Sequence, residues 1–127
     1  MRVVPRMLQS TLSIQGPPGT GKTHTAARTV LDLVERGKRV GITSGSHKAI
    51  LNLMAACAAL HGGELACLKV GGDRDDPLLA RIPGARHSVG GREGAARARE
   101  HALIGGTAWF FARPEMTGRL DYLFVDE

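Results

Sequence analysis

The sequence predicts an α/β fold in which helices cover both faces of a parallel sheet. Stretches rich in β-branched residues alternate along the chain with stretches of helical periodicity. A glycine-rich loop joins the first predicted strand to the first predicted helix, and the last predicted strand ends in two acidic residues. The chain has 127 residues, which suits one domain, so we assign residues 1–127 to a single α/β unit.

The first half of the chain contains two predicted strand–helix pairs. Residues 11–14 are apolar and β-branched, which indicates a buried strand. A helix should begin near Lys22 and end before Gly37, because apolar residues recur at helical spacing and glycine is typical of a helix C-terminus. Those apolar residues are Ala26, Ala27, Val30, Leu31 and Val34. Residues 39–43 then predict a second strand.

The second predicted helix is capped by Ser44 or Ser46 and ends at the two glycines that follow His61. One apolar stripe runs along it and should face the core. It consists of Ile50, Leu53, Met54, Cys57 and Leu60.

The second half of the chain is less regular. Residues 65–70 predict a third strand, whereas residues 71–99 are dominated by Gly, Pro, Arg and Asp. We predict a long surface loop insertion there, with room for a short helix over residues 92–100. A strand over residues 102–104, a short aromatic helix closed by Pro114, and a buried strand over residues 122–125 complete the chain.

Composition sets broad limits on function. The formal net charge is +5 and the isoelectric point is about 9.9, which favours a polyanionic partner, although an Arg-rich, Ala-rich and Gly-rich genome would give the same balance. Cys57 and Cys67 lack metal-ligand spacing and are interpreted as buried reduced thiols. No apolar run approaches the length of a membrane span and no signal peptide is evident, so a cytoplasmic protein is expected.

The strongest motif is Gly16-Pro17-Pro18-Gly19-Thr20-Gly21-Lys22-Thr23, which has the spacing of a P-loop, or Walker A motif. Glycines let the backbone curl so that N–H groups point at phosphate oxygens, and the following helix adds its positive dipole end. Lys22 can reach the β- and γ-phosphates as a catalytic cation, and the Thr23 hydroxyl can bind Mg²⁺. His24 follows directly and is included among the predicted nucleotide-binding residues.

The second motif is the apolar run over residues 122–125 followed by Asp126 and Glu127. Downstream of a P-loop this pattern predicts a Walker B motif, in which Asp126 lies near Mg²⁺ and Glu127 activates the attacking water. An Asp-Glu pair disfavours small GTPases, and no guanine-reading Asn-Lys-x-Asp motif is present, so ATP with Mg²⁺ is the expected ligand.

The motifs together resemble the first motor domain of superfamily 1 helicases. Residues 14–23 are similar to motif I, residues 40–50 to motif Ia, residues 105–108 to a Gly-Thr segment that contacts nucleic acid, and residues 126–127 to the start of motif II. The variant of motif I is typical of the branch that includes the nonsense-mediated-decay RNA helicase and the replication helicase–nuclease. Within these motifs, residues 43–48 and 105–109 are especially similar to prokaryotic helicases fused to a RecB-like nuclease domain.

The resemblance implies a RecA-like P-loop NTPase, cut at Walker B, whose parent couples ATP hydrolysis to movement on single-stranded nucleic acid, DNA more than RNA. Thr43, Ser44, Ser46 and Thr107 would contact backbone phosphates, which positions a strand without reading its sequence. Ser44 and Ser46 can equally be helix caps, and His47 with Lys48 a solvated helix start. The second motor domain, its arginine finger and any fused nuclease would lie beyond residue 127, so the fragment alone should bind ATP weakly and hydrolyse it very slowly.

Two alternatives remain from the sequence. One is a P-loop ATPase of the AAA type that is not a helicase, against which residues 40–50 argue. The other is a truncated, non-catalytic nucleotide-binding module. Trp109 and Phe110 could stack on bases, although core packing is the expected role of both.

Overall fold

The computed structural model describes residues 2–5, 12–13 and 20–126, with side chains from residue 23 onward. Within those residues the chain alternates between strands and helices. The strands are β1 (Arg2–Pro5), β2 (Leu12–Ser13), β3 (Val40–Ser44), β4 (Cys67–Val70), β5 (Ala85–Ser88), β6 (Leu103–Gly105) and β7 (Tyr122–Asp126). The helices are α1 (Thr20–Glu35), α2 (His47–His61), α3 (Gly91–Ala98) and α4 (Ala108–Phe111), with two 3₁₀ turns, η1 (Leu79–Arg81) and η2 (Pro114–Met116).

Five of the strands form a parallel sheet in the order β7, β3, β6, β4, β5. This arrangement confirms the predicted α/β, RecA-like class. Beside β7 the sheet continues with β1, which is antiparallel to β7, and then with β2, which is antiparallel to β1. The sequence did not predict β1. Antiparallel strands at the edge of a largely parallel sheet are common, and all four residues of β1 pair with residues 122–125 of β7.

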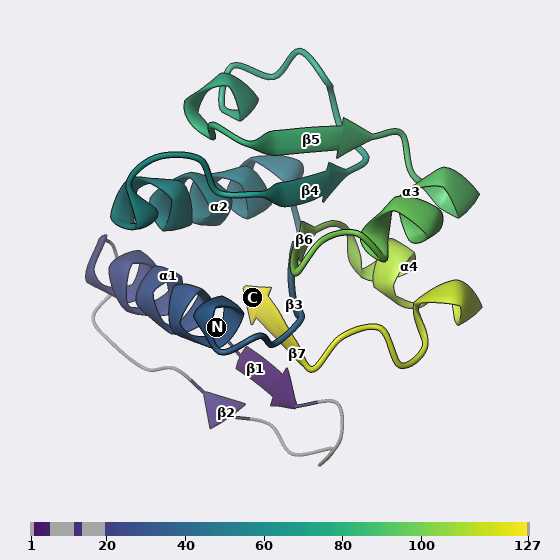
Figure 1. Ribbon diagram of the computed structural model, residues 1–127, viewed down its shortest axis with the longest axis horizontal. Helices are drawn as coiled ribbons and strands as arrows, with labels where there is room; N and C mark the ends of the chain where they lie inside the picture. Colours follow the sequence, from purple (N-terminus) through teal and green to yellow (C-terminus); the bar gives the residue numbers. More distant parts are fainter. Residues whose placement is uncertain (1, 6–11, 14–19, 127) are drawn as a thin grey trace.

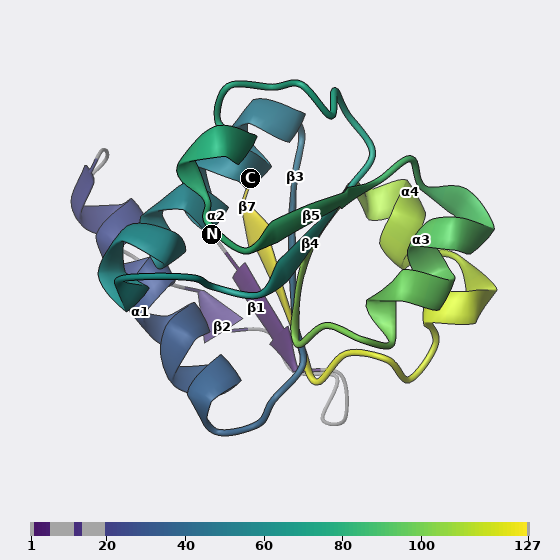
Figure 2. The same ribbon diagram turned by 45° about the horizontal axis from the view of Figure 1, so that its top comes forward.

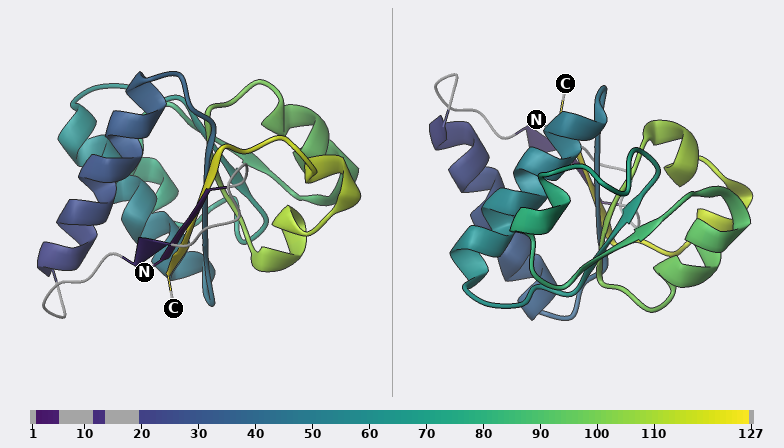
Figure 3. Two further views of the ribbon diagram at one scale, coloured as in Figure 1. Left: turned by 90° about the horizontal axis from the view of Figure 1, so that it is seen from below. Right: turned by 90° about the horizontal axis from the view of Figure 1, so that it is seen from above.

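Helices cover both faces of the sheet (Figures 1 and 2). α1 and α2 pack against each other on one face, where α1 contributes Ala26, Ala27, Val30 and Leu31 to the buried core. α3, α4 and η2 cover the other face around Phe110 and Phe111. The two views of Figure 3 show these two helical layers with the sheet between them. The predicted three-layer architecture is therefore present, with a separate apolar core on each side.

Local sequence signals explain where α1 and α2 begin and end. Ser46 is the N-cap of α2, and its Oγ accepts a hydrogen bond of 3.1 Å from the Ala49 N–H. Gly37 has φ +80°, and its N–H donates to the Val34 carbonyl at the end of α1. Gly62 is the C-cap of α2. Of the two predicted caps of α2, the structure selects Ser46 and places Ser44 at the end of β3.

Two expectations about packing were wrong. Leu60, placed in the apolar stripe of α2, is 40% exposed, because the last turn of the helix extends past the core. Trp109 is 86% exposed, while its neighbour Phe110 is buried as expected. α4 is a helix of four residues, so it can turn only part of its surface to the sheet, and Phe110 and Phe111 occupy that part.

The segment of residues 71–99 also differs from its prediction as a surface loop insertion. It contains η1, β5 and α3, and β5 pairs in parallel with β4 over four residues. Its helix α3 (Gly91–Ala98) lies close to the short helix that the sequence suggested over residues 92–100. Its second part, from β5 to α3, therefore belongs to the sheet and to one helical layer, whereas residues 71–84 contain turns and η1 but no strand.

Candidate functional site

The candidate site lies at the edge of the sheet where the parallel strands end. β3 ends at Ser44, β7 at Asp126, β6 at Gly105, β4 at Val70 and β5 at Ser88. In an open α/β sheet, ligands bind at this carboxyl edge, where the loops that follow the strands come together. Figure 3 shows the end of β7 at the same side of the molecule as the beginning of α1 and the junction of β3 with α2.

The predicted nucleotide-binding residues lie partly within the described chain. Gly16, Pro17, Pro18 and Gly19 lie outside it, whereas Thr20, Gly21 and Lys22 form the first turn of α1. Thr23 is half-buried in the same helix and His24 is exposed. α1 has 16 residues and no acidic residue in its first turn, so its N-terminus is suited to an anion such as phosphate.

Asp126 is the last residue of β7, and it pairs in register with Ser44 at the end of β3. Asp126, the predicted metal ligand, and Ser44, a predicted nucleic-acid contact, are therefore neighbours on two parallel β-strands. Glu127 lies outside the described residues. The register places Asp126, the first acidic residue of the predicted Walker B motif, beside the loop that leads into α2.

The four predicted nucleic-acid residues fall into three structural situations. Ser46 and Thr107 are N-caps, and Thr107 Oγ1 accepts the Phe110 N–H at 3.4 Å. Each capping oxygen accepts a hydrogen bond, so its own proton is still free to donate to a phosphate. Ser44 is half-buried at the end of β3. Thr43 is only 4% exposed, so its hydroxyl does not reach the surface, and Oγ1 has no hydrogen-bond partner within the described part of the chain.

A buried lysine, which the sequence analysis did not single out, lies at the same edge. Lys69 of β4 is 1% exposed, and its ammonium group donates to three acceptors. These are His47 Nδ1 at 2.7 Å, the Gly71 carbonyl at 3.0 Å and the Val70 carbonyl at 3.2 Å. Burial lowers the pKa of Lys69 from 10.5 to about 8, with a smaller opposing effect of Asp76. An ammonium group has three protons, so every donor of Lys69 is satisfied.

The lysine determines the protonation of His47. An ammonium group cannot accept a hydrogen bond, so His47 Nδ1 must be the acceptor and the ring proton lies on Nε2. The pKa of His47 is lowered by burial and by the nearby Lys69 and His87, which also favours the neutral ring. His47 was predicted to be a solvated helix start. It is instead half-buried and tied to β4, whereas its neighbour Lys48 is exposed as expected.

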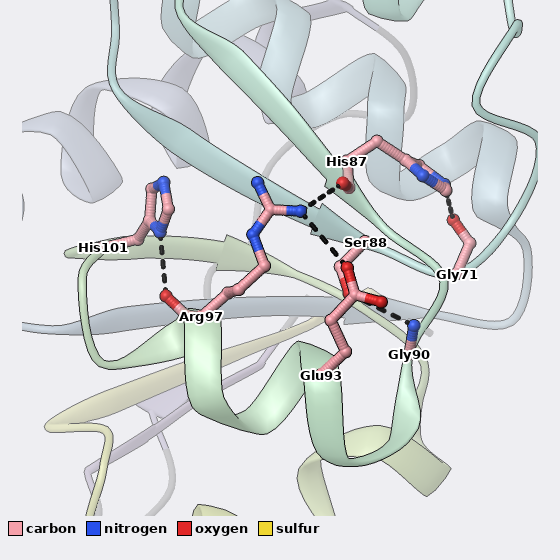
Figure 4. A network of polar contacts seen from close by, with 7 residues as sticks. All are labelled: Gly71, His87, Ser88, Gly90, Glu93, Arg97 and His101. Carbon is pink, nitrogen blue, oxygen red and sulfur yellow. Dashed lines mark hydrogen bonds and ion pairs between the residues drawn. The ribbon is translucent and has the colours of Figure 1, made fainter.

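The loop after β4 is held by a second histidine and by a polar network around α3 (Figure 4). His87 Nε2 is 2.9 Å from the Gly71 carbonyl, so this nitrogen must donate. Arg97 of α3 donates to the His87 carbonyl at 2.7 Å and lies 3.5 Å from Glu93 one turn earlier. Ser88 Oγ accepts the Gly90 N–H at 3.3 Å. These contacts fix the loops after β4 and β5 relative to each other.

Two signals in the sequence could have revealed this cluster. Lys69 interrupts an apolar strand and is followed by Gly71 and Gly72, both of which have positive φ. A Cβ on Gly72 would lie 3.1 Å from the His47 ring, so the glycines leave space for the imidazole. The pairing of Lys69 with His47 depends on tertiary structure, because 22 residues separate them.

Comparison with known proteins agrees with this geometry. The model of the AAA domain family matches residues 2–90, which is more than half of the chain. This chain belongs to the AAA domain family. Over 41 residues it is 46% identical to the DNA polymerase alpha-associated DNA helicase A of Schizosaccharomyces pombe. That alignment covers 32% of this chain and 6% of the helicase. No solved structure matches this chain.

The described part of this AAA domain has three further properties. None of its helices combines the length and apolar character needed to cross a membrane. Cys57 and Cys67 are free and buried, as predicted, and burial raises the pKa of each thiol to about 12. No cluster of three His, Cys, Asp or Glu residues that could hold a metal occurs among the described residues.

Proposed function

We propose that this chain is the ATP-binding wall of a nucleic-acid motor of the superfamily 1 type. The observation that carries the proposal is the register of β3 with β7, which sets Asp126 beside Ser44 at the edge where α1 begins. Residues that bind the nucleotide and residues that bind nucleic acid would then lie on the two neighbouring β-strands β3 and β7. Hydrolysis of the nucleotide could then alter the nucleic-acid contacts through these two β-strands.

The nucleotide half of the site uses the first turn of α1 and the end of β7. We propose that backbone N–H groups of the P-loop and the Lys22 ammonium bind the phosphates, and that Thr23 and Asp126 hold Mg²⁺. When bound, Mg²⁺ neutralises charge on the β- and γ-phosphates. Glu127 would orient the attacking water and accept its proton.

The nucleic-acid-binding half of the site uses the loops that follow β3 and β6. Ser44, Ser46 and Thr107 present hydroxyls at one edge of the sheet, and hydroxyl donors of this kind bind phosphates irrespective of base sequence. We propose single-stranded DNA as the preferred strand, because the similar S. pombe protein is named as a DNA helicase. A second motor domain would close the other side of the nucleotide site. A fused RecB-like nuclease fits the branch that the motifs resemble.

Thermal unfolding of the 127-residue chain with and without Mg–ATP tests the nucleotide half. A ligand at about 100 times its Kd stabilises a folded protein by about 2.7 kcal/mol, which raises Tm by roughly 10 °C in a domain of this size. We expect a rise with Mg–ATP and a smaller one with Mg–GTP. Lys22→Ala should abolish the rise, whereas Lys38→Ala, which removes an exposed cation from the loop after α1, should retain it.

The controls separate the alternatives. An equal rise in the Lys22→Ala variant would disprove phosphate binding by the P-loop, and a wild-type chain without any rise would disprove ATP binding. A rise with Mg–ATP but no binding of single-stranded DNA or RNA would favour an AAA-type ATPase that is not a helicase. The match to the AAA domain family is the observation that favours this second candidate function.

A further inference from the structure

A hollow of about 270 Å³ opens at the carboxyl edge, between the loop after β4, the loop between β5 and α3, and α4. Its floor is apolar, since Val70 and Phe110 are 3% and 5% exposed. Val89 and Trp109 stand at its sides and are 66% and 86% exposed. Pockets for drug-sized ligands occupy about 300–1,000 Å³, so this hollow has room for a single ring system.

Trp109 does not contribute to the packing of the chain. Phe110 and Phe111, which follow it, are buried and contact each other edge to face with ring centroids 5.3 Å apart. Those two rings and the Thr107 cap hold α4 in place. The indole of Trp109 therefore presents a large flat apolar surface to solvent. With the exposed Val89 on the same hollow it forms an apolar patch rimmed by polar groups, and a patch of this kind can mark a binding site.

Polar groups surround the apolar floor. His47 lines the hollow, and its hydrogen bond from Lys69 leaves Nε2–H as a donor on the ring. Arg113 lies on the rim and donates to Glu115 through Nη2 at 2.8 Å, while its buried Nε has no partner within the described residues. Thr107, a predicted strand contact, lies on the same rim. No acidic residue is among those that line the hollow.

We propose that the hollow binds one nucleobase of a single strand, stacked on Trp109, with His47 and Arg113 as hydrogen-bond donors at its rim. The inference rests on the proposed strand-binding function and adds the residues that would receive a base. Phosphate contacts at Ser46 and Thr107 would fix the backbone next to the hollow. Stacking on an aromatic ring tolerates every base, which suits a protein that moves along a strand. A net charge of +5 and a lining without carboxylates favour a polyanion over an apolar peptide, and the flat exposed indole favours a stacked base over an acidic peptide.

Trp109 is the single tryptophan of the chain, so its fluorescence reports directly on the proposed contact. The experiment titrates the 127-residue chain with oligothymidine, oligouridine and an abasic strand of equal length, each labelled at one end. Anisotropy of the label measures binding, and tryptophan emission measures stacking. We expect the two strands with bases to bind and to quench the emission. The abasic strand should bind more weakly and leave the emission unchanged.

Variants test the contribution of the indole to affinity. Stacking of one base on an aromatic side chain is worth about 1–3 kcal/mol, so Trp109→Ala should weaken binding by about tenfold or more. Trp109→Phe should recover part of that loss. Leu60→Ala is the matched control, because it removes another exposed apolar side chain at the far end of α2 and should leave affinity unchanged. Lys22→Ala should still show quenching, because no described residue of α1 lines the hollow.

Each outcome has one meaning. Binding without quenching, quenching of equal size by the abasic strand, or unchanged affinity in Trp109→Ala would overturn the stacking site and leave the proposed function standing. An absence of any anisotropy change with all three strands would overturn strand binding, and the stacking site with it. Equal quenching by oligothymidine and oligouridine supports a site that receives either nucleic acid.

Discussion

At the scale of single residues, Lys69 is the least expected feature of the candidate site. A buried ammonium group is tolerated only when its protons are bonded, and His47 with the carbonyls of Val70 and Gly71 meets that requirement. A lysine within an apolar strand predicted none of these partners, because two of them belong to the backbone of a turn and the third to another helix. The start of α1, in contrast, was predictable from sequence, because a glycine-rich stretch followed by helical periodicity is a local signal. Thr20, Gly21 and Lys22, the described residues of the predicted P-loop, form the first turn of that helix.

The pKa of Lys69 leads to a prediction about stability. Its folded value of about 8 lies below the ordinary 10.5, so between these values the unfolded chain binds more protons and stability rises with pH. Relative to Lys69→Met, the wild-type chain should therefore gain on the order of 3 kcal/mol between pH 8 and pH 10.5. Cys57 and Cys67, with raised thiol pKa values, reduce stability above pH 9 in both proteins, so they cancel. Urea unfolding at several pH values measures the difference, and a difference that stays constant would contradict the assignment.

At the scale of elements, the sequence predicted best where burial imposes a period. α1 and α2 were found within about two residues, because their apolar residues repeat at helical spacing against the sheet. β5 was missed because it is the last strand of the sheet and is not fully buried. Its residues Ala85, Arg86, His87 and Ser88 show no apolar run, and only Ser88 is buried. An edge strand of this kind is defined by its pairing with β4 and leaves little trace in composition.

The contact between β6 and α2 gives a prediction at this scale. A Cβ on Gly105 would lie 2.5 Å from Met54 Sδ and 2.8 Å from Ile50 Cγ2, so α2 can approach β6 only over a glycine. Gly105→Ala should therefore destabilise the chain by about 1–3 kcal/mol through overpacking. Gly45→Ala is the control, since a Cβ there meets nothing within 4 Å and Gly45 lacks a positive φ. Urea midpoints report the result, and equal stabilities of the two variants would show that α2 can shift away from β6.

At the scale of the whole molecule, two helical layers pack on opposite faces of one sheet. Cys57 on α2 and Cys67 on β4 lie fully buried in the core that α1 and α2 share with the sheet, and the Cys57 thiol lies 3.9 Å from the Ala27 carbonyl of α1. Neither thiol can meet a reagent unless this core opens. Labelling of both thiols by a disulfide reagent should therefore follow opening of this whole layer. In a domain of ordinary stability, labelling of the native chain should be slower than labelling in urea by roughly 10³-fold or more.

Gly105→Ala should speed the labelling of both thiols by the factor expected from its loss of stability. Mg–ATP should slow the labelling if the P-loop binds it. Rapid reaction of the native chain would mean that this layer opens independently of the rest of the molecule.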